Sequence, residues 1–421
     1  MTARKLGLVF FPAYDWAISP DHPEREERLL YTQDQLREEG LFDLPGLAEY
    51  RPEVAGDDDV HRVHVRPPGV ERLAALPHLI SAGGAIAAGR LVMEGDCLKS
   101  FALVRPPGHH AMRVVHGGRG FCNINNEAIM IERLRHEYGL GRVAIVDTDC
   151  HHGDGTQDIY WHDPDTLFIS LHQDGRTLYP GSGFIEEMGG PSALGSTVNI
   201  PLPPETGDAG FLLAAREIVR PILDEWRPDL VVNSAGQDNH FSDPITNMKI
   251  TAHGYAALSE IIDPQIAVLE GGYSIRGALP YLNLAIALAM AGLDWQKVEE
   301  PGPEPARLAT SPQSLDYIKR LGQEIHRRRR APGRPADYRR DGRWWVRERS
   351  IFYDTHALEG GDGYGGAIHE RQREELYDCP DCPGLLVIHT RSEVSRPSVH
   401  PLPPRRACPR CLALAEEMKR A

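Results

Sequence analysis

Short apolar runs that lack helical amphipathicity alternate with helical patterns over the first 295 residues or so, and this alternation constrains the fold more than any other feature. The runs are FALV (101–104), VAIV (143–146), LFISL (167–171), LVV (230–232) and IAVL (266–269). Such runs are typical of strands that are covered on both faces. The helical patterns between them lie at residues 125–139, 208–227 and 251–263. The sequence therefore predicts an α/β fold, with a mostly parallel sheet flanked by helices on both faces.

The composition is that of an ordinary globular protein with room for one large domain and something smaller: 421 residues, of which 41% are apolar and 25% charged. The formal net charge of −14 argues against a general affinity for nucleic acid, so nucleic acid is not expected as a partner. No apolar run approaches the length that spans a membrane. The N-terminal run LGLVFF is too short for a signal peptide and predicts a first strand. Together these features predict a cytoplasmic protein.

Polar residues follow each of the five predicted strands. The carboxyl ends of parallel strands meet at one edge of a sheet, where open α/β folds bind ligands, so these residues are expected to gather in one site. Convergence of so many groups is hard to explain by accident. The groups are Arg105 to His110, Asp147 to Asp154, Ser170 to His172, Ser234 to Asp238 and Glu270 to Tyr273.

The stretch VAIVDTDCHHGDGTQ (143–157) carries the strongest signal. Asp147, Asp149 and His151 are two residues apart, so a continuing strand would project them from one face. Two buried carboxylates beside an imidazole are costly unless a cation holds them. Asp149 and His151 are therefore candidate ligands of a divalent metal, with Asp238 as a third, and three ligands leave a position open for catalysis. The alternative is a capped strand end whose polar groups only satisfy loop amides.

A series of motifs, spread in order over about residues 1–295, resembles that of the zinc-dependent histone deacetylase family. Each motif alone is unspecific, but the ensemble is highly specific, and RPPGHHA and LEGGY are closer to the class II and bacterial acetylpolyamine amidohydrolase branch. The resemblance implies the arginase-deacetylase fold and a metal-dependent amidohydrolase. The motifs are HPEREERL near the start, RPPGHHA (105–111), GFCNINN (120–126), DTDCHHGDGTQ (147–157), ISLHQ with YPGSG (169–183), SAGQDNHFSDP (234–244) and LEGGY (269–273).

The resemblance also assigns metal sites to individual residues. It implies a catalytic zinc ion on Asp149, His151 and Asp238. It further implies a structural potassium ion near Asp147, Asp149, His151 and Ser170, bound partly through backbone carbonyl groups. The Asp-His-Asp set could also hold ferrous iron or cobalt, since ligand type does not fix the metal.

By the same resemblance, His109 and His110 form a tandem pair backed by Asp147 and Asp154, and Tyr273 is the catalytic tyrosine. These residue types suit amide hydrolysis, which needs an activated water, a polarised carbonyl and a proton for the leaving amine. Tyr273 follows two glycines that allow a tight turn, and its hydroxyl would donate to the developing oxyanion. Asp154 replaces the Asn that is usual in class II members, so we expect His110 to be protonated more readily than in that branch.

The residues around this centre predict the substrate. Gly120, Phe121 and Tyr179 match positions that form a narrow channel for an extended acylated amine in the family, and His172 is a further candidate lining residue. Such a channel suits the apolar stem of lysine. Members that prefer acetylated polyamines tend to carry an acidic residue where this chain has Ile245. The sequence therefore favours acyl-lysine in a peptide or protein, with an acylated polyamine or another small amine as the alternative.

Four cysteines near the C-terminal end form a second metal motif. CPDC (379–382) and CPRC (408–411) are separated by 25 residues, the spacing of two zinc knuckles that flank a small hairpin. The candidate ligands of a structural zinc ion, as in a zinc ribbon, are Cys379, Cys382, Cys408 and Cys411. This module could bind a protein partner. The alternative is a thiol-rich tail without metal.

Composition divides the chain into three parts. We predict a deacetylase catalytic domain at residues 1–298, a linker and basic extension at 299–350 and a C-terminal zinc-ribbon module at 351–421. The linker is rich in proline and acid. The arginine-rich extension, with Trp344 and Trp345, is predicted to be a solvated helix face, with a contact to acidic protein or nucleic acid as the alternative.

A function of another class is also compatible with the sequence: a non-catalytic binding protein that keeps the fold and works through the C-terminal module. Such a protein is expected to lose a metal ligand, a histidine of the pair or the tyrosine, and all these positions are intact. Arginase chemistry on the same fold needs extra carboxylates for a second metal, which the sequence does not provide. An active metal-dependent deacylase is therefore favoured.

Overall fold

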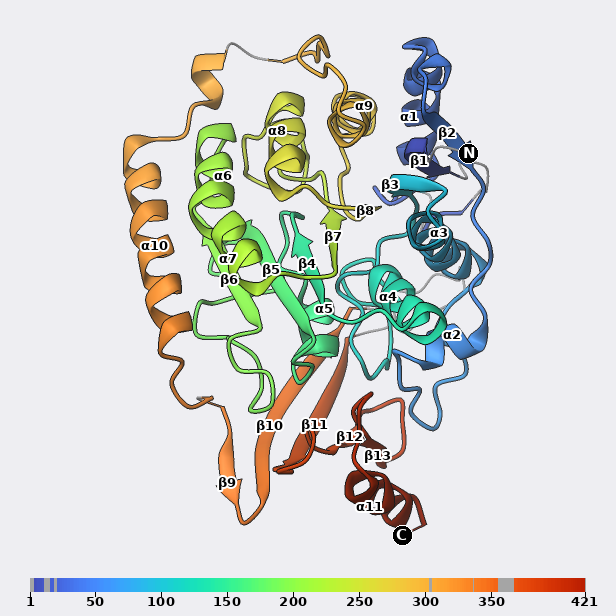
Figure 1. Cartoon of the computed structure of the whole chain (residues 1–421), viewed down its shortest axis with the longest axis vertical. Helices are drawn as coiled ribbons and strands as arrows, with labels where there is room; N and C mark the ends of the chain where they lie inside the picture. Colours follow the sequence, from blue (N-terminus) through green and yellow to red (C-terminus); the bar gives the residue numbers. More distant parts are fainter. Residues whose placement is uncertain are drawn as a thin grey trace.

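An eight-stranded sheet runs through the larger part of the molecule (Figure 1). It is seen in a computed structural model, which describes residues 4–10, 16–18, 21–302, 305–335, 337–354 and 367–420. Every pair of neighbouring strands in this sheet is parallel. In order across the sheet, the strands are β2 (Leu47–Tyr50), β1 (Arg4–Phe10), β3 (Cys97–Leu103), β8 (Ile266–Leu269), β7 (Leu230–Ala235), β4 (Val143–Asp147), β5 (Thr166–Gln173) and β6 (Thr197–Leu202).

The strands predicted from the sequence are confirmed. β3, β8, β7, β4 and β5 lie next to one another in the sheet, and the predicted first strand, β1, lies beside β3. Because all of them are parallel, their carboxyl ends meet at the same edge. The sequence patterns missed β2 and β6, which form the two outer edges. β6 contains Asn199 and Pro201, residue types that are rare in strands but tolerated at an edge.

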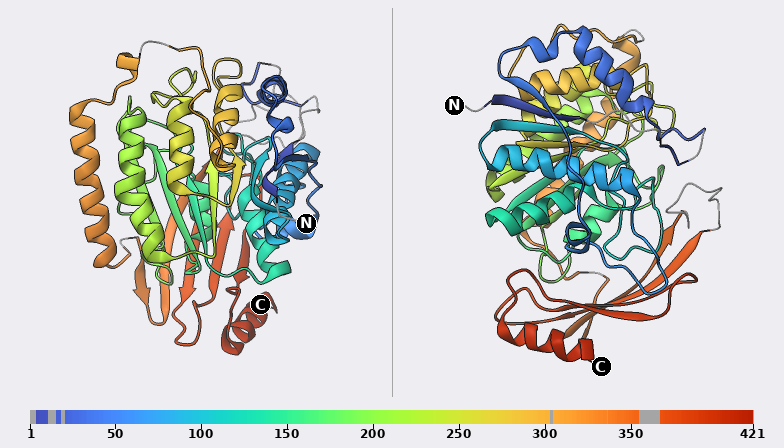
Figure 2. Two further views of the ribbon diagram at one scale, coloured as in Figure 1. Left: turned by 45° about the horizontal axis from the view of Figure 1, so that its top comes forward. Right: turned by 90° about the vertical axis from the view of Figure 1, so that its right-hand side faces the viewer.

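Helices cover both faces of the sheet, as predicted (Figure 2). The helices of this part of the chain are α1 (Glu27–Glu38), η1 (Leu41–Asp43), α2 (Asp57–His61), α3 (Leu76–Met93), α4 (Asn126–Tyr138), α5 (Asp154–Tyr160), α6 (Asp208–Ala214), η2 (Ala215–Val219), α7 (Arg220–Trp226), α8 (Ala252–Ile262), α9 (Leu279–Met290), η3 (Pro305–Leu308) and α10 (Pro312–Arg330). Alternate residues of β4 face two separate cores. Ala144 and Val146 belong to a core formed with α1 and α6 to α10. Val143 and Ile145 belong to the other core, formed with α2 to α5.

The three helical patterns are also confirmed, as α4, α8 and the run from α6 through α7. That run is interrupted by η2, a turn of π-helix. η2 ends at Val219, two residues before Pro221 in the first turn of α7. A proline cannot donate an intrahelical hydrogen bond, so the hydrogen-bonding register of the helix changes there.

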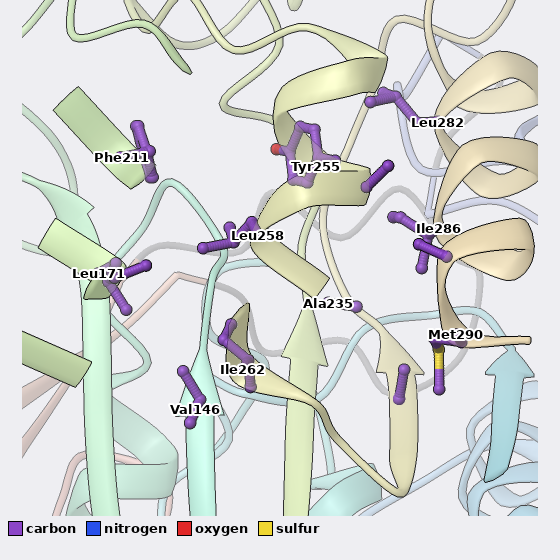
Figure 3. Close-up of a cluster of buried hydrophobic side chains, with 14 of the residues drawn as sticks. Val146, Leu171, Phe211, Ala235, Tyr255, Leu258, Ile262, Leu282, Ile286 and Met290 are labelled. Carbon is purple, nitrogen blue, oxygen red and sulfur yellow. The ribbon is translucent and has the colours of Figure 1, made fainter. Parts of the chain in front are cut away.

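The larger core forms between the sheet and the pair α8 and α9 (Figure 3). Leu258 and Ile262 of α8 lie over Val146 and Leu171 of the sheet, and all four side chains are at most 2% exposed. Burying an aliphatic side chain of this size contributes about 1.5–3 kcal/mol. This packing therefore holds in place the strands whose ends carry the predicted site.

Contrary to the expectation from the sequence, α3 has the length and apolar composition of a membrane-spanning helix, but more than half of that span is buried inside the fold. It packs on α4, β3 and β1. Contacts of this kind are those of a core helix, and they account for its apolar residues.

A second sheet, five-stranded and antiparallel, follows α10 (Figure 1). Its elements are β9 (Arg339–Asp341), β10 (Trp344–Tyr353), β11 (Ile368–Tyr377), β12 (Leu386–Arg391), β13 (Ser398–Leu402) and the final helix α11 (Pro409–Arg420). The basic stretch predicted as a solvated helix face is therefore helical only in α10. In β10, Ile351 and Tyr353 are buried while Phe352 between them is 41% exposed, which is the period of a strand. The predicted boundary between residues 350 and 351 falls inside β10.

One face of the second sheet packs on the first part of the chain (Figure 2). Ile351 and Tyr353 form a buried cluster with Met112, and Leu376 belongs to another with Val114. Met112 and Val114 follow the predicted tandem histidines by only a few residues. The second sheet and α11, described over residues 339–354 and 367–420, are therefore packed beside the predicted site and are called the C-terminal module from here on.

A buried ion cluster joins the start of the chain to the carboxyl edge of the sheet. Glu24 accepts hydrogen bonds from Arg28 at 3.0 Å and from Arg105 at 2.5 and 3.0 Å. Burial alone would raise the pKa of Glu24, but the charges of Arg105 and Arg28 lower it below its usual value. Arg28 also donates to the carbonyl oxygens of Glu270 and Gly272, at 2.5 and 2.8 Å. The cluster therefore holds the turn that follows β8.

We expect Glu24→Gln to lower the free energy of unfolding by about 3–5 kcal/mol, because it leaves two buried guanidinium groups without their carboxylate. The matched control is Glu38→Gln, at an exposed position of α1, where the expected change is at most about 0.5 kcal/mol. Urea unfolding of the two variants measures both values. A loss for Glu24→Gln as small as that of the control would show that the arginines find other partners.

Candidate active site

Asp149, His151 and Asp238 come together at the carboxyl edge of the sheet, on the loops after β4 and β7. One ligand atom of each lies within 4.8 Å of those of the other two. His151 Nδ1 is 3.1 Å from Asp149 Oδ1 and 2.8 Å from Asp238 Oδ2. Both carboxylates are fully buried, and the histidine side chain is 12% exposed. Two carboxylates and an imidazole at these distances are a donor set suited to a divalent metal.

The triad carries a negative charge on its two carboxylates that a bound cation would compensate. Burial raises the pKa of Asp238, and the neighbouring charge of Asp149 raises it further. Burial alone would lower the pKa of His151, but Asp238 and Asp149 raise it to about 10. A proton on His151 thus balances part of the negative charge, and a divalent cation would compete with that proton. The residues therefore fit a metal ion.

His109 and His110 each hydrogen-bond a carboxylate. His109 Nδ1 lies 3.1 Å from Asp147 Oδ2, and His110 Nδ1 lies 2.7 Å from Asp154 Oδ1. The two rings are 4.1 Å apart between centroids. His109 Nε2 faces the triad, 3.8 Å from Asp149 Oδ1. Both imidazoles are thus oriented by a carboxylate beside the candidate metal site.

The two histidines differ in protonation. Burial would lower the pKa of His109, but the charges of Asp149 and Asp147 raise it well above its usual value. The pKa of His110 is lowered to about 3, because burial and the charge of His109 outweigh the effect of Asp154. Asp154 does raise the pKa of His110, but by less than those two effects lower it. His110 is therefore the neutral imidazole of the pair.

Tyr273 follows β8 in a turn that only glycine allows. A Cβ at Gly271 would come within 2.6 Å of carboxylate oxygens of Asp149 and Asp238, and Gly272 has a φ of 124°. The turn therefore lies directly against the metal ligands. Burial raises the pKa of the Tyr273 phenol well above its usual value. Its hydroxyl stays protonated and can donate a hydrogen bond.

Gly120, Phe121 and Tyr179, the predicted channel residues, are only partly buried. The ring of Phe121 packs against that of Tyr273, with centroids 5.5 Å apart, and the ring of Tyr179 packs against His110 at 5.2 Å. Phe121 has a φ of 68°, a rare conformation for a bulky residue. A Cβ at Gly120 would come within 2.2 Å of the His110 ring. These residues therefore contact the predicted catalytic residues directly.

The remaining predicted residues lie around this centre. The ring of His172 is fully buried between Ser170 Oγ at 2.8 Å and the carbonyl oxygen of Gly183 at 2.9 Å, so it faces the interior. Ser170 is the register partner of Asp147 in the pairing of β4 with β5. Ile245 is 37% exposed.

Two residues next to the tandem histidines were assigned no individual role from the sequence. Glu270 Oε2 accepts hydrogen bonds from the backbone N–H groups of Gly108 and His109, at 2.7 and 3.0 Å. Its place directly after a predicted strand had put it among the polar residues expected at this edge. Arg119 donates to Asp154 Oδ2 through Nε at 3.0 Å and Nη2 at 2.5 Å. It therefore fixes the carboxylate that orients His110.

A third residue comes from the C-terminal module. Asp354, directly after β10, accepts hydrogen bonds through Oδ2 from the N–H of Gly120 at 2.6 Å and from the hydroxyl of Tyr179 at 3.2 Å. Arg119 also donates to the carbonyl oxygen of Phe352. No sequence signal pointed to Asp354, because it reaches the site only through the docking of the second sheet.

A second candidate metal site lies in the C-terminal module. The Sγ atoms of Cys379 and Cys408 are 3.5 Å apart, as are those of Cys382 and Cys411. The four sulfur atoms lie within 4.8 Å of one another. β12 and β13 form an antiparallel hairpin between the two pairs, as the spacing predicts. These distances are too long for disulfides, and four thiolates so arranged suit a tetrahedral structural zinc ion.

Comparisons with known proteins agree with this site. A family model described as the histone deacetylase domain matches residues 68–287. A probable deacetylase from Archaeoglobus fulgidus is 46% identical over 327 residues, which cover 70% of this chain and 89% of that protein. An acetylpolyamine amidohydrolase from Burkholderia pseudomallei is 36% identical over 249 residues, which cover 53% of this chain and 71% of that protein. The crystal structure of the HDA15 HD domain matches with a TM-score of 0.64 at 26% identity, covering 77% and 95% of the two chains.

The fold and the site together define a metal-dependent amidohydrolase of the arginase-deacetylase type. The chain belongs to the histone deacetylase family, and its relatives place it near the acetylpolyamine amidohydrolase branch. The family is zinc-dependent and hydrolytic, which agrees with the triad and its surroundings.

We expect the protein to hold two zinc ions per chain, one at the triad and one at the four cysteines. Asp238→Asn should remove the first and Cys411→Ser the second, so each variant should retain one equivalent. Elemental analysis after dialysis measures these contents. An Asp238→Asn protein with the zinc content of the parent would contradict the triad as a metal site.

The affinity of the triad for zinc should also depend on pH. His151, with a pKa of about 10, is protonated at neutral pH and must lose that proton to bind metal. Over the pH range below that pKa, the affinity for zinc is therefore expected to rise about tenfold for each unit by which the pH increases. Zinc titration of the Cys411→Ser variant against a competing chelator at several pH values measures the slope. An affinity independent of pH would show that His151 is not a ligand.

Proposed function

We propose that this protein removes acetyl or other acyl groups from the side-chain amine of lysine in peptides or proteins. The observation that carries the proposal is that a buried Asp149–His151–Asp238 triad lies beside two carboxylate-paired histidines and a protonated tyrosine. Hydrolysis of a linear amide needs these groups: a Lewis acid, a base, a proton donor and a donor for the developing oxyanion.

Each residue has a place in this reaction. Zinc held by the triad would act as a Lewis acid on the amide carbonyl and lower the pKa of a water molecule. His110, neutral because its pKa is low, accepts the proton of the attacking water. His109, oriented by its hydrogen bond to Asp147, delivers a proton to the leaving amine. Tyr273 donates its hydroxyl to the carbonyl oxygen as negative charge develops there.

The choice of acyl-lysine rests on the residues near the metal site. Phe121 and Tyr179 offer aromatic surface to the apolar stem of lysine. The residue after Asp243 and Pro244 is Ile245, so this position brings no carboxylate to attract the secondary ammonium of a polyamine. An acetylated polyamine is the second candidate, favoured by the similarity to the Burkholderia acetylpolyamine amidohydrolase.

A potassium ion near Asp147 and Ser170 is a further part of the proposal. Both residues are fully buried. Burial raises the pKa of Asp147 to about 7. A monovalent cation beside this carboxylate would favour its ionised form, which is the form that orients His109.

The test is release of acetate from an acetyl-lysine peptide and from an acetylated polyamine at equal concentrations by the zinc-loaded protein. We expect the peptide to be turned over faster. Tyr273→Phe should lower kcat by roughly 10²–10³-fold, because it removes one oxyanion donor and keeps the ring.

A preference for the polyamine would overturn the acyl-lysine assignment and leave the amidohydrolase intact. No turnover of either substrate would count against the deacylase itself.

Asp154→Asn should move the acidic limb of the pH–rate profile to lower pH. The charge of Asp154 raises the pKa of His110. Without that charge the pKa of His110 falls, and the ring stays neutral down to a lower pH. Profiles of kcat/KM against pH for the two proteins measure the shift. An unchanged profile would mean that His110 does not set the acidic limb.

A further inference from the structure

The C-terminal module reaches the candidate active site through the end of β10. The Tyr353 side chain is fully buried, and its hydroxyl donates to the carbonyl oxygen of Val114 at 2.6 Å. The next residue, Asp354, donates its backbone N–H to the carbonyl oxygen of Gly118 at 3.0 Å. The backbone of Asp354 is therefore held against the loop that carries Arg119, Gly120 and Phe121.

The carboxylate of Asp354 lies beside the predicted channel residues. Its Oδ2 atom accepts hydrogen bonds from Gly120 and Tyr179, which contact His110 and the triad side of the site. Asp354 is partly exposed, as are Gly120 and Tyr179, whereas His109 and His110 are at most 3% exposed. A carboxylate at this position lies on the solvent side of the catalytic residues.

The Asp354 carboxylate forms no ion pair with a described residue. Arg119, the cation on the adjacent loop, is already bound to Asp154 through two nitrogen atoms and to the carbonyl oxygen of Phe352. Within the described ranges no arginine, lysine or histidine nitrogen lies within 4.0 Å of the Asp354 carboxylate. Arg119 forms its ion pair with Asp154, and its charge acts on that of Asp354 only over a longer distance. Asp354 therefore adds a negative charge at the rim of the site.

We propose that Asp354 forms a subsite, supplied by the C-terminal module, that recognises a cationic group flanking the acylated amine of the substrate. This inference rests on the proposed function. In an acyl-lysine peptide, the cation is a lysine or arginine side chain next to the acyl-lysine. Ile245 offers no charge to such a cation. In this proposal the negative charge that favours a basic substrate is that of Asp354, at the end of β10 in the second sheet.

The test compares two acetyl-lysine peptides that differ only in the flanking residues, arginine in one and glutamate in the other. The wild-type protein should prefer the basic peptide in kcat/KM. Asp354→Asn should lower kcat/KM for the basic peptide by about fivefold, through KM, and leave the acidic peptide unchanged or improved. An equal loss for both peptides, or an undiminished preference, would overturn the proposal.

Two controls separate recognition from folding and from overall charge. Asp341→Asn removes the same charge from the same module, at a position that is 67% exposed. Asp341 pairs with Trp344 at the far end of β10, about 30 Å from Asp354 at about 3.3 Å per residue. This variant should not alter the preference. In the wild-type protein, raising salt from 0.1 M to 1 M should weaken the preference, because it screens a partly exposed charge. A preference that does not change with salt would count against Asp354 as its source.

Failure of the proposed function has a different signature. In that case the wild-type protein turns over neither acetyl-lysine peptide but does turn over an acetylated polyamine. The role of Asp354 is then judged on an acetylated diamine against a neutral acetylated alkylamine of similar length. Loss of the preference for the charged amine in Asp354→Asn would support the subsite, and its persistence would overturn it.

Discussion

Buried negative charge at one edge of the parallel sheet is the constraint on which the rest of the structure depends. The buried carboxylates there are Asp147, Asp149, Asp154, Asp238, Asp243 and Glu270. Such groups must be paired, hydrogen-bonded or protonated. Burial and the charge of Glu127 raise the pKa of Glu270 well above its usual value, whereas Arg119 keeps Asp154 ionised against the effect of burial. The triad has the donor geometry for a metal ion.

The compensating groups come from distant parts of the chain, so the site is coupled to the whole fold. Arg28 of α1, paired with Glu24, holds the backbone on either side of Gly271. Arg119 joins Asp154 to the second sheet. The C-terminal module is therefore part of the support of the site, as well as a carrier of the four cysteines. This coupling explains why a domain boundary inside β10 does not correspond to a structural division.

The site residues that could be predicted from the sequence are those placed by local spacing along the chain. The residues that the sequence missed reach the site through contacts between distant segments. Asp149 and His151 are two positions apart after a strand, and Tyr273 follows two glycines, so spacing alone brought them to one edge. The arginine-rich extension is helical only up to Arg330, and beyond it the predicted helix face was wrong because arginines usually indicate solvent. Arg347 is in fact buried in β10, where Glu374 of β11 lies 2.8 Å from it. Cross-strand pairing of this kind leaves no local pattern.

The sequence by itself determined the parallel sheet, the edge that carries the site and the candidate metal ligands, because strand period and motif spacing act over a few residues. It also determined the four-cysteine motif and the hairpin between its pairs. Only the tertiary structure decided that Arg119 would fix Asp154 and that Asp354 would reach Gly120, 234 positions earlier in the chain. Such contacts arise when two separately formed sheets dock, and the shape and charge of both surfaces, rather than any local pattern, bring the groups together.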